Sequence, residues 1–311
     1  MIAEGNTFFF PWEVSLMEWL QAHFGPAALS ILSFFSSFGE ELVMVLILCF
    51  IYWSYDKRLG KALGLSVLMG LVWAPMIKNL FLRRRPYFDH EKITILRVVE
   101  PEADIYDISA QGYSFPSGHS ANAASLYGAL AAQKKRRWLT VLGVAIPLLV
   151  GVSRVVVGAH YPTDVLVGWV LGVAAMLIVS ALRKRIQNTA VFYAVLLAAA
   201  VPGFFFCRSA DYYTAVGLLI GFAGGTLLEE KRVQFESTRN PIQMILRLAG
   251  GIAVYFALNA ALKLPFDKAF LNGGSYGALL VRCARYAVVA FVGFGVYPML
   301  FKTMAKIGAA K

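Results

Sequence analysis

Charged side chains are scarce in this sequence. Only 15% of its 311 residues are Asp, Glu, Lys or Arg, whereas 59% are hydrophobic. A soluble globular domain carries charge on about a quarter of its residues, because its surface faces water. The composition therefore excludes an ordinary soluble domain and indicates a chain that lies in a bilayer.

Cysteine is rare, and basic residues are missing from the start of the chain. The three cysteines, Cys49, Cys207 and Cys283, lie far apart in apolar segments, which argues against a disulfide framework or a cysteine metal site. They are expected to be inert, buried thiols. No Lys or Arg precedes Lys57, so the first residues lack the basic region of a cleavable secretion signal.

Apolar blocks of helical length occupy most of the chain. A helix that rises 1.5 Å per residue needs about 20 apolar residues to cross a hydrocarbon core of about 30 Å. About nine blocks approach this length, so the predicted fold class is all-α, a polytopic bundle of membrane helices. The predicted spans are 36–54, 61–82, 117–133, 138–157, 162–182, 189–207, 212–228, 243–262 and 278–300.

The first 35 residues are predicted to form an amphipathic helix along the membrane surface. Trp12, Glu13, Glu18 and Trp19 combine acidic and aromatic side chains in this segment, a composition that suits the interface. The alternative is a tenth span over residues 15–35, which would move the N-terminus to the opposite side of the membrane.

Basic residues recur in alternate connectors between the predicted spans. Positive charge near the ends of spans marks the cytoplasmic side, so the intervening connectors, including 83–116 and 158–161, are expected to face outward. The net charge of +11 is spread over the connectors and forms no patch for nucleic acid. The basic connectors contain Lys57, Arg58 and Lys61, then residues 134–137, then residues 183–185, then Lys231 and Arg232.

Three polar stretches interrupt the apolar pattern on the predicted outer side. Ionisable residues at membrane depth are costly and usually functional. The first stretch, KNLFLRRRP, contains Lys78 and Arg85. Their spacing of seven residues predicts that they lie two helical turns apart on one face, with Pro86 ending the helix.

The other two stretches contain histidines. FPSGHS, at 115–120, begins a predicted span with Ser, Gly and His. SRVVVGAHYPTD, at 153–164, contains Arg154, His160 and Asp164. Backbone N–H groups at a helix start favour an anion, and Arg and Lys supply further donors. A pocket that gathered these groups would fit a phosphate.

The same residues resemble the three signature motifs of the type-2 phosphatidic acid phosphatase superfamily, which includes lipid phosphate phosphatases, undecaprenyl-diphosphate phosphatases and glucose-6-phosphatase. The motifs are K-x6-RP, PSGH and SR-x5-H-x3-D, and every motif position, from Lys78 to Asp164, is matched in order. The likeness covers the first five predicted spans. Together with the predicted spans, it divides the chain into an interfacial segment over 1–35, a five-span catalytic core over 36–185 and a four-span extension over 186–311.

The resemblance also implies roles for single residues. His160 would be the nucleophile that forms a phosphohistidine, and Asp164 would hold its other ring nitrogen if a helix begins at or just after His160. His119 would protonate the leaving oxygen and then activate water. No metal or other cofactor is implied, because cations stabilise the charge. The phosphate oxygens would be bound by Lys78, Arg85, Ser117, Gly118 and Arg154.

The function implied is metal-independent hydrolysis of a lipid phosphate monoester or diphosphate, such as phosphatidate or a prenyl diphosphate, at the extracytoplasmic face of the cell membrane. The expected partners are this substrate and membrane lipids, without nucleic acid, and the oligomeric state is left open. Three alternatives remain: a phosphatase of a soluble sugar phosphate, a lipid phosphotransferase, and a non-catalytic protein that binds or transports lipids.

Four arginines lie outside the motifs. Arg83 and Arg84 are left open between binding lipid headgroups and touching the substrate. Arg282 and Arg285 are predicted to snorkel to the membrane interface.

Overall fold

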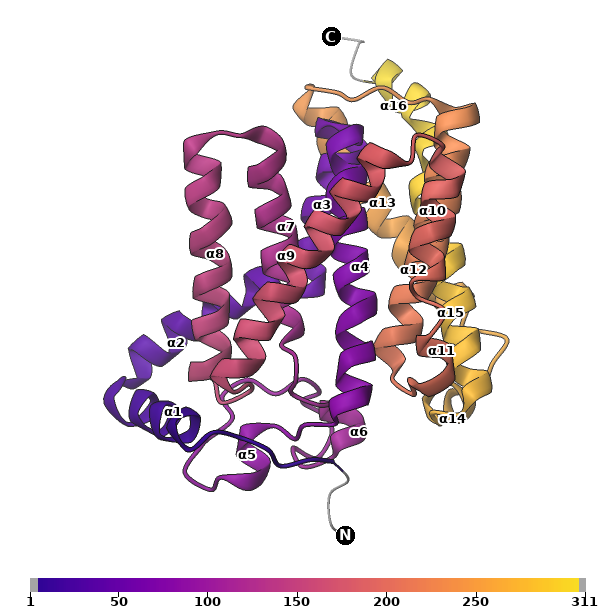
Figure 1. Cartoon of the computed structure of the whole chain (residues 1–311). Coiled ribbons are helices and arrows are strands. Elements are labelled where there is room, and N and C mark those ends of the chain that lie inside the picture. The colour runs from indigo at the N-terminus through magenta and orange to yellow at the C-terminus, as the bar shows by residue number, and fades with distance from the viewer. Residues whose placement is uncertain (1–4, 308–311) are drawn as a thin grey trace. The chain divides into compact units, whose positions relative to one another are not determined.

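The computed structural model describes residues 5–307, and all its regular elements are helices apart from an isolated bridge between Asn6 and Arg83. Residues 1–4 and 308–311, at the ends of the predicted interfacial segment and extension, lie outside the described residues. Figure 1 shows the course of the chain through its helices. The label η is used for short 3₁₀ or π-helical turns. The elements are α1 (Pro11–His23), α2 (Pro26–Phe35), η1 (Ser36–Gly39), α3 (Glu41–Phe50), η2 (Ile51–Tyr55), α4 (Lys57–Phe81), α5 (Pro86–Asp89), α6 (Ile108–Gln111), α7 (Gly118–Lys134), α8 (Arg137–Val156), α9 (Pro162–Arg185), α10 (Thr189–Ala198), α11 (Gly203–Phe206), α12 (Ala210–Leu228), η3 (Glu229–Val233), α13 (Pro241–Ala261), α14 (Lys268–Asn272), α15 (Tyr276–Phe291), η4 (Val292–Val296), η5 (Tyr297–Leu300) and α16 (Phe301–Ile307).

Each predicted span coincides with helical structure, with ends displaced by a few residues. Among the described residues, six helical segments are long and apolar enough to cross a membrane, and a pair bent by 50° would add a seventh if it is one broken span. That pair joins Pro26–Gly39 to Glu41–Tyr55. The all-α class is confirmed, while the count of nine spans stays a prediction.

The chain forms two compact units. The first contains the residues up to Met44 and Trp73–Leu177, and the second contains Val45–Val72 and the residues from Ile178 onward. The chain passes between the units inside α3, α4 and α9, without a loop. The three-part division expected from the sequence stays a prediction.

Close packing of α7, α8 and α9 organises the first unit. Helix α7 packs along α8. Helix α9 approaches α7 at Gly168 and Gly172, where an added Cβ would lie 2.6 Å from the carbonyl oxygen of Ser117 and 2.2 Å from that of Ala121. Only glycine permits so close an approach of two backbones. The starts of α7 and α9 are thereby brought together.

Helix α1 of the first unit has one buried and one exposed face. Glu13 and Met17 are fully buried, whereas Trp12 and Trp19 are about half exposed. This amphipathic pattern suits the predicted position at a membrane surface. Because α1 ends before Gly25, whose backbone is extended, residues 15–35 do not form one continuous helix. The alternative of a continuous tenth span is therefore not confirmed.

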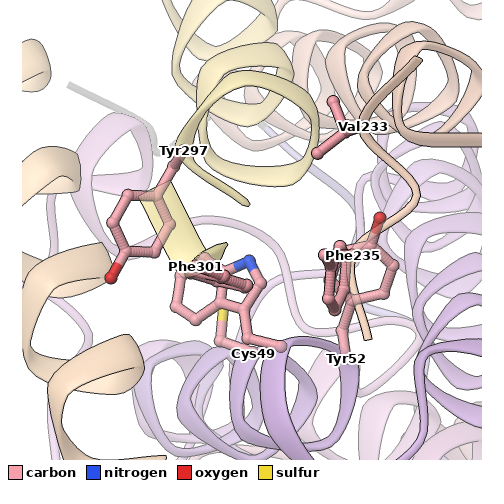
Figure 2. Close-up of a cluster of buried hydrophobic side chains, with 7 residues drawn as sticks. Cys49, Tyr52, Val233, Phe235, Tyr297 and Phe301 are labelled. Atoms are coloured by element: carbon pink, nitrogen blue, oxygen red, sulfur yellow. The ribbon is translucent and has the colours of Figure 1, made fainter. Parts of the chain in front are cut away.

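Small residues and aromatic side chains hold the second unit together. At Gly217 and Gly221 of α12, an added Cβ would lie 2.2 Å and 2.1 Å from carbonyl oxygens of α15. Small residues four positions apart let the two helices approach closely. Figure 2 shows a cluster of buried side chains, comprising Cys49, Tyr52, Trp53, Val233, Phe235, Tyr297 and Phe301. The three cysteines of the chain are buried and free, as predicted.

The two arginines of α15 also lie in the second unit. Arg285 is buried and donates from Nη2 to Asn259 Oδ1 of α13 at 2.8 Å. The prediction that Arg285 snorkels to the interface is wrong, because α13 offers it an acceptor inside the unit. Arg282 is half-buried, and its Nη1 lies 3.4 Å from Thr214 Oγ1 of α12.

Candidate active site

All the predicted site residues lie in the first unit. The last turn of α4 provides Lys78, and the extended segment after it provides Arg85. The remaining residues come from the start of α7, the end of α8 and the turn that leads into α9. Residues that are distant in sequence therefore belong to one packed group of elements.

Lys78 and Arg85 reach the site differently from the prediction. Helix α4 ends at Phe81, and Leu82 has a φ of 52°, in the left-handed region. The following backbone is held by Asn6, which donates to the carbonyl of Leu82 and accepts from the N–H of Arg84. The prediction that Lys78 and Arg85 share one helical face is wrong, because this pairing draws the chain out of the helix.

Backbone carbonyls orient these two cations. Arg85 is buried, and its Nε donates to the carbonyls of Gln111 and Gly112 at 2.9 Å and 3.0 Å. Its Nη1 donates to the carbonyl of Ala159, next to His160, at 3.1 Å. Lys78 Nζ donates to a fourth carbonyl, that of Tyr113, at 2.7 Å. The side chain of Arg85 thus spans from the loop before α7 to the turn before α9.

The start of α7 is built as an N-terminal cap. Ser117 Oγ accepts from the N–H of Ser120 at 3.4 Å and lies 2.9 Å from its hydroxyl. Ser117 also donates its own N–H to the carbonyl of Asp164 at 2.9 Å, which ties α7 to α9. A Cβ added at Gly118 would meet nothing within 4 Å. The start of the helix therefore has open space beside Gly118, where an anion could approach the backbone N–H.

His160 and Asp164 form the contact that the resemblance implied. Helix α9 begins at Pro162, and His160 Nδ1 lies 3.5 Å from Asp164 Oδ2. The same carboxylate oxygen accepts the N–H of Tyr161 at 2.8 Å. Both side chains are buried. Because Nδ1 faces the carboxylate, Nε2 is the ring nitrogen available for chemistry.

The two histidines lie in one cationic environment. The charges of Lys78, Arg85 and Arg154 act on both imidazoles, and His119 acts on His160. Burial, with these cations, holds the pKa of His160 well below its usual 6.5. The imidazole of His160 is therefore neutral at pH 7, the form in which a ring nitrogen can act as a nucleophile.

Arg154 is buried, and one of its donors has no acceptor among the described residues. Its Nη1 donates to Ser36 Oγ at 3.3 Å, and that hydroxyl lies 2.7 Å from Ser153 Oγ. Its Nε is buried without a hydrogen-bond partner among the described residues. A buried donor of this kind is costly unless a ligand accepts from it. Ser36 was not predicted, since a serine among apolar residues gives no local signal.

The structure also assigns the two arginines that the sequence left open. Arg84 pairs with Asp89 at 2.5 Å. Arg83 is buried and pairs with both Asp164, at 2.6 Å, and Glu13, at 2.9 Å. Arg83 therefore contacts the carboxylate predicted to hold His160, a position that neither of the predicted roles anticipated.

Comparisons with known proteins agree with the three motifs. Residues 59–188 match the model of the PAP2 superfamily, and residues 213–310 match that of the PAP2 superfamily phosphatase, transmembrane extension. The chain is similar to an undecaprenyl-diphosphatase from Sulfolobus acidocaldarius, with 31% identity over 45% of this chain and 63% of that protein. It is also similar to phosphatidylglycerophosphatase B from Bacillus subtilis, with 35% identity over 26% of this chain and 44% of that protein.

A lipid A 1-phosphatase from Rhizobium etli is 33% identical over 38% of this chain and 47% of that protein. The chain thus spans less than two thirds of the length of these relatives. No solved structure matches it. The matched transmembrane extension, together with the apolar helices, makes this a multi-pass membrane protein. With its motifs in one packed unit and two models of the same superfamily matched along its length, the chain belongs to the PAP2 superfamily.

Proposed function

We propose that this protein is a membrane phosphatase that hydrolyses a lipid phosphate monoester or diphosphate at the extracytoplasmic face. The observation that carries the proposal is the meeting of two histidines, a carboxylate and three cations in one unit. The relatives are named as phosphatases of an undecaprenyl diphosphate, a phosphatidylglycerophosphate and lipid A, which supports the substrate class.

The first step is attack by His160 on phosphorus. The Nε2 lone pair forms a P–N bond while the bond from phosphorus to the leaving oxygen breaks. His119, protonated when the negative phosphate offsets the surrounding cations, gives its proton to that oxygen. The imidazole becomes positively charged in the phosphohistidine. Asp164, facing Nδ1 at 3.5 Å, stabilises that charge. This distance is longer than a hydrogen bond, and such contacts often tighten when substrate binds.

The second step regenerates the enzyme. His119 now accepts a proton from water, whose oxygen attacks phosphorus as the P–N bond breaks and the electron pair returns to Nε2. Lys78, Arg85 and Arg154 stabilise the negative charge on the phosphoryl oxygens, together with the hydroxyl of Ser117 and the N–H of Gly118. The unpartnered Nε of Arg154 supports this role. Because side-chain cations provide the electrostatic stabilisation, the reaction needs no metal.

Phosphate release from purified protein in detergent tests the activity. The panel should contain phosphatidate, a prenyl diphosphate and a sugar phosphate, and the lipid substrates should be turned over fastest. His160→Gln should abolish release, whereas His23→Gln, at an exposed histidine of α1, should leave it unchanged. Turnover retained by folded His160→Gln would rule out the proposed nucleophile.

Labelling in intact cells tests the face on which the site opens. Glu102 and Gln133 are both exposed, in the loop before α7 and near the end of α7. A membrane-impermeant thiol reagent should modify Glu102→Cys and spare Gln133→Cys. The native cysteines are buried and should not react with it in either variant. The opposite pattern would place the site on the cytoplasmic side.

A further inference from the structure

A buried chain of charges connects α1 to the proposed catalytic pair. Glu13 pairs with Arg83, Arg83 pairs with Asp164, and Asp164 faces His160. Glu13, Arg83 and Asp164 are all almost completely inaccessible to solvent. Glu13 lies outside the matched PAP2 domain, residues 59–188, and Arg83 is not one of the motif positions. The motifs alone therefore do not account for the surroundings of His160.

Arg83 is fixed by its contacts on all sides. Its Nη1 donates to Asp164 Oδ1 at 2.6 Å and to Thr163 Oγ1 at 2.8 Å. Its Nε donates to the carbonyl of Phe8 at 2.8 Å. Its guanidinium lies 3.9 Å from the ring centroid of Tyr161. A planar donor held in this way can hold the Asp164 carboxylate in one orientation.

Glu13 is equally constrained, through both of its oxygens. Oε1 accepts the N–H of Thr163 at 3.0 Å and its hydroxyl at 2.6 Å. Oε2 accepts the N–H of Phe10 and Nη2 of Arg83, both at 2.9 Å. Burial by itself raises the pKa of Glu13, but these hydrogen bonds and the charge of Arg83 outweigh it and lower the pKa below its usual 4.5. Glu13 is therefore ionised at neutral pH.

The charges in this chain bear directly on the nucleophile. Arg83 alone would neutralise Asp164 and weaken its hold on an imidazole that becomes positive. Glu13 offsets Arg83, so that the three groups together keep one net negative charge beside Nδ1 of His160. The other charged or titratable groups that act on His160 are Lys78, Arg85, Arg154 and His119.

We propose that Glu13 and Arg83 are positioning residues of the active site, where Arg83 holds the Asp164 carboxylate against His160 and Glu13 preserves its negative charge. The inference rests on the proposed phosphatase function, and it makes α1 a part of the catalytic unit. A purely structural role does not require charge here, because buried ion pairs stabilise folds no better than apolar side chains of similar volume.

Two matched pairs of variants test the proposal. Glu13→Gln keeps the size and acceptor oxygen of the side chain, and Glu18→Gln removes the same charge from a partly exposed position of α1. Arg83→Gln is matched by Arg84→Gln at the neighbouring arginine. Phosphate release should show kcat lowered roughly 10- to 100-fold in Glu13→Gln and Arg83→Gln, the loss expected when a catalytic group is misplaced. KM should change much less, and both controls should behave like the wild type.

The pH profile separates positioning from a general structural role. Loss of the negative Glu13 disfavours protonation of His160, so the acid limb of kcat/KM should move to lower pH in Glu13→Gln. Loss of the positive Arg83 has the opposite effect, so the limb should move to higher pH in Arg83→Gln. The double variant removes one charge of each sign, and its limb should return towards the wild-type position while kcat stays low.

The outcomes distinguish this inference from the proposed function. If the wild type releases no phosphate, the proposed function fails. If the wild type is active and His160→Gln is not, but Glu13→Gln and Arg83→Gln match their controls, the positioning role fails. Acid limbs that coincide in folded single variants would also overturn it. If the single variants do not fold, a folded double variant with wild-type kcat would also overturn the positioning role.

Discussion

Replacing Asp164 by Asn removes one charge from the site and leaves the side chain nearly the same size. Asp164 Oδ2 lies 3.5 Å from His160 Nδ1. At an effective dielectric constant of about 20, two unit charges at that separation attract by about 5 kcal/mol. Arg83, at 2.6 Å from the same carboxylate, reduces the attraction between Asp164 and the charged imidazole of His160. The charged imidazole should therefore lose between about half and all of this attraction when Asp164 is replaced by Asn.

Each 1.36 kcal/mol corresponds to a factor of ten in rate, so kcat should fall between roughly 50-fold and 3,000-fold in Asp164→Asn. The amide has a further effect, because its NH₂ group facing Nδ1 would favour the tautomer in which Nε2 carries the proton. The fold should be retained, since in this orientation the amide oxygen still accepts from Nη1 of Arg83, and only the hydrogen bond from the N–H of Tyr161 is lost.

Phosphate release at saturating substrate measures this effect, with the thermal unfolding midpoint measured in the same detergent. The matched control is Asp89→Asn, which breaks the neighbouring ion pair with Arg84 and should keep wild-type kcat. Folded Asp164→Asn that retains more than about a tenth of wild-type kcat would refute the electrostatic role of Asp164.

Three further predictions concern the nucleophile, the phosphate pocket and the packing beneath it. Because burial and nearby cations lower the pKa of His160, its ring stays neutral on acidification, and kcat/KM should not decline between about pH 7.5 and 6.5; a decline centred at 6.5 would contradict this. Vanadate, which mimics trigonal-bipyramidal phosphorus, should inhibit release, whereas loss of activity in EDTA would contradict a metal-free reaction. Gly172→Ala places a Cβ 2.2 Å from the carbonyl of Ala121 and should destabilise the protein by about 1–3 kcal/mol in thermal unfolding, whereas Gly128→Ala, whose Cβ meets only a sulfur at 3.5 Å, should not.

Much of the site could be predicted because its geometry is local in the chain. The contact between His160 and Asp164 requires only that a helix begin just after His160, and Pro162 favours such a start. Ser117 similarly stands where an N-cap residue is expected, directly before the glycine that begins α7. Short spacings combined with recognisable helix starts determine these relations without knowledge of the rest of the fold.

The contacts that were missed depend on distant segments. Arg83 turns inward because Asn6 pairs with the backbone on either side of it, after Leu82 has left the helix. Glu13 meets Thr163 across 150 residues of sequence. A periodic pattern in the sequence shows which face of α1 is polar, but not which partner that face will meet. The triple-arginine run distinguishes Arg83 from isolated basic residues, whereas nothing local distinguishes Glu13 from Glu18.

The charge distribution explains why one fold needs both the motif cations and the buried chain behind them. In the proposed reaction, positive charge develops on His160 while negative charge concentrates on the phosphoryl oxygens. Cations alone would stabilise the oxygens but oppose the charged imidazole, and burial together with that opposition holds the pKa of His160 low. The net negative charge of Glu13, Arg83 and Asp164 acts on Nδ1 and counteracts it. The nucleophile can thus be neutral before attack and stabilised as a cation during it, a combination that neither set of charges would provide alone.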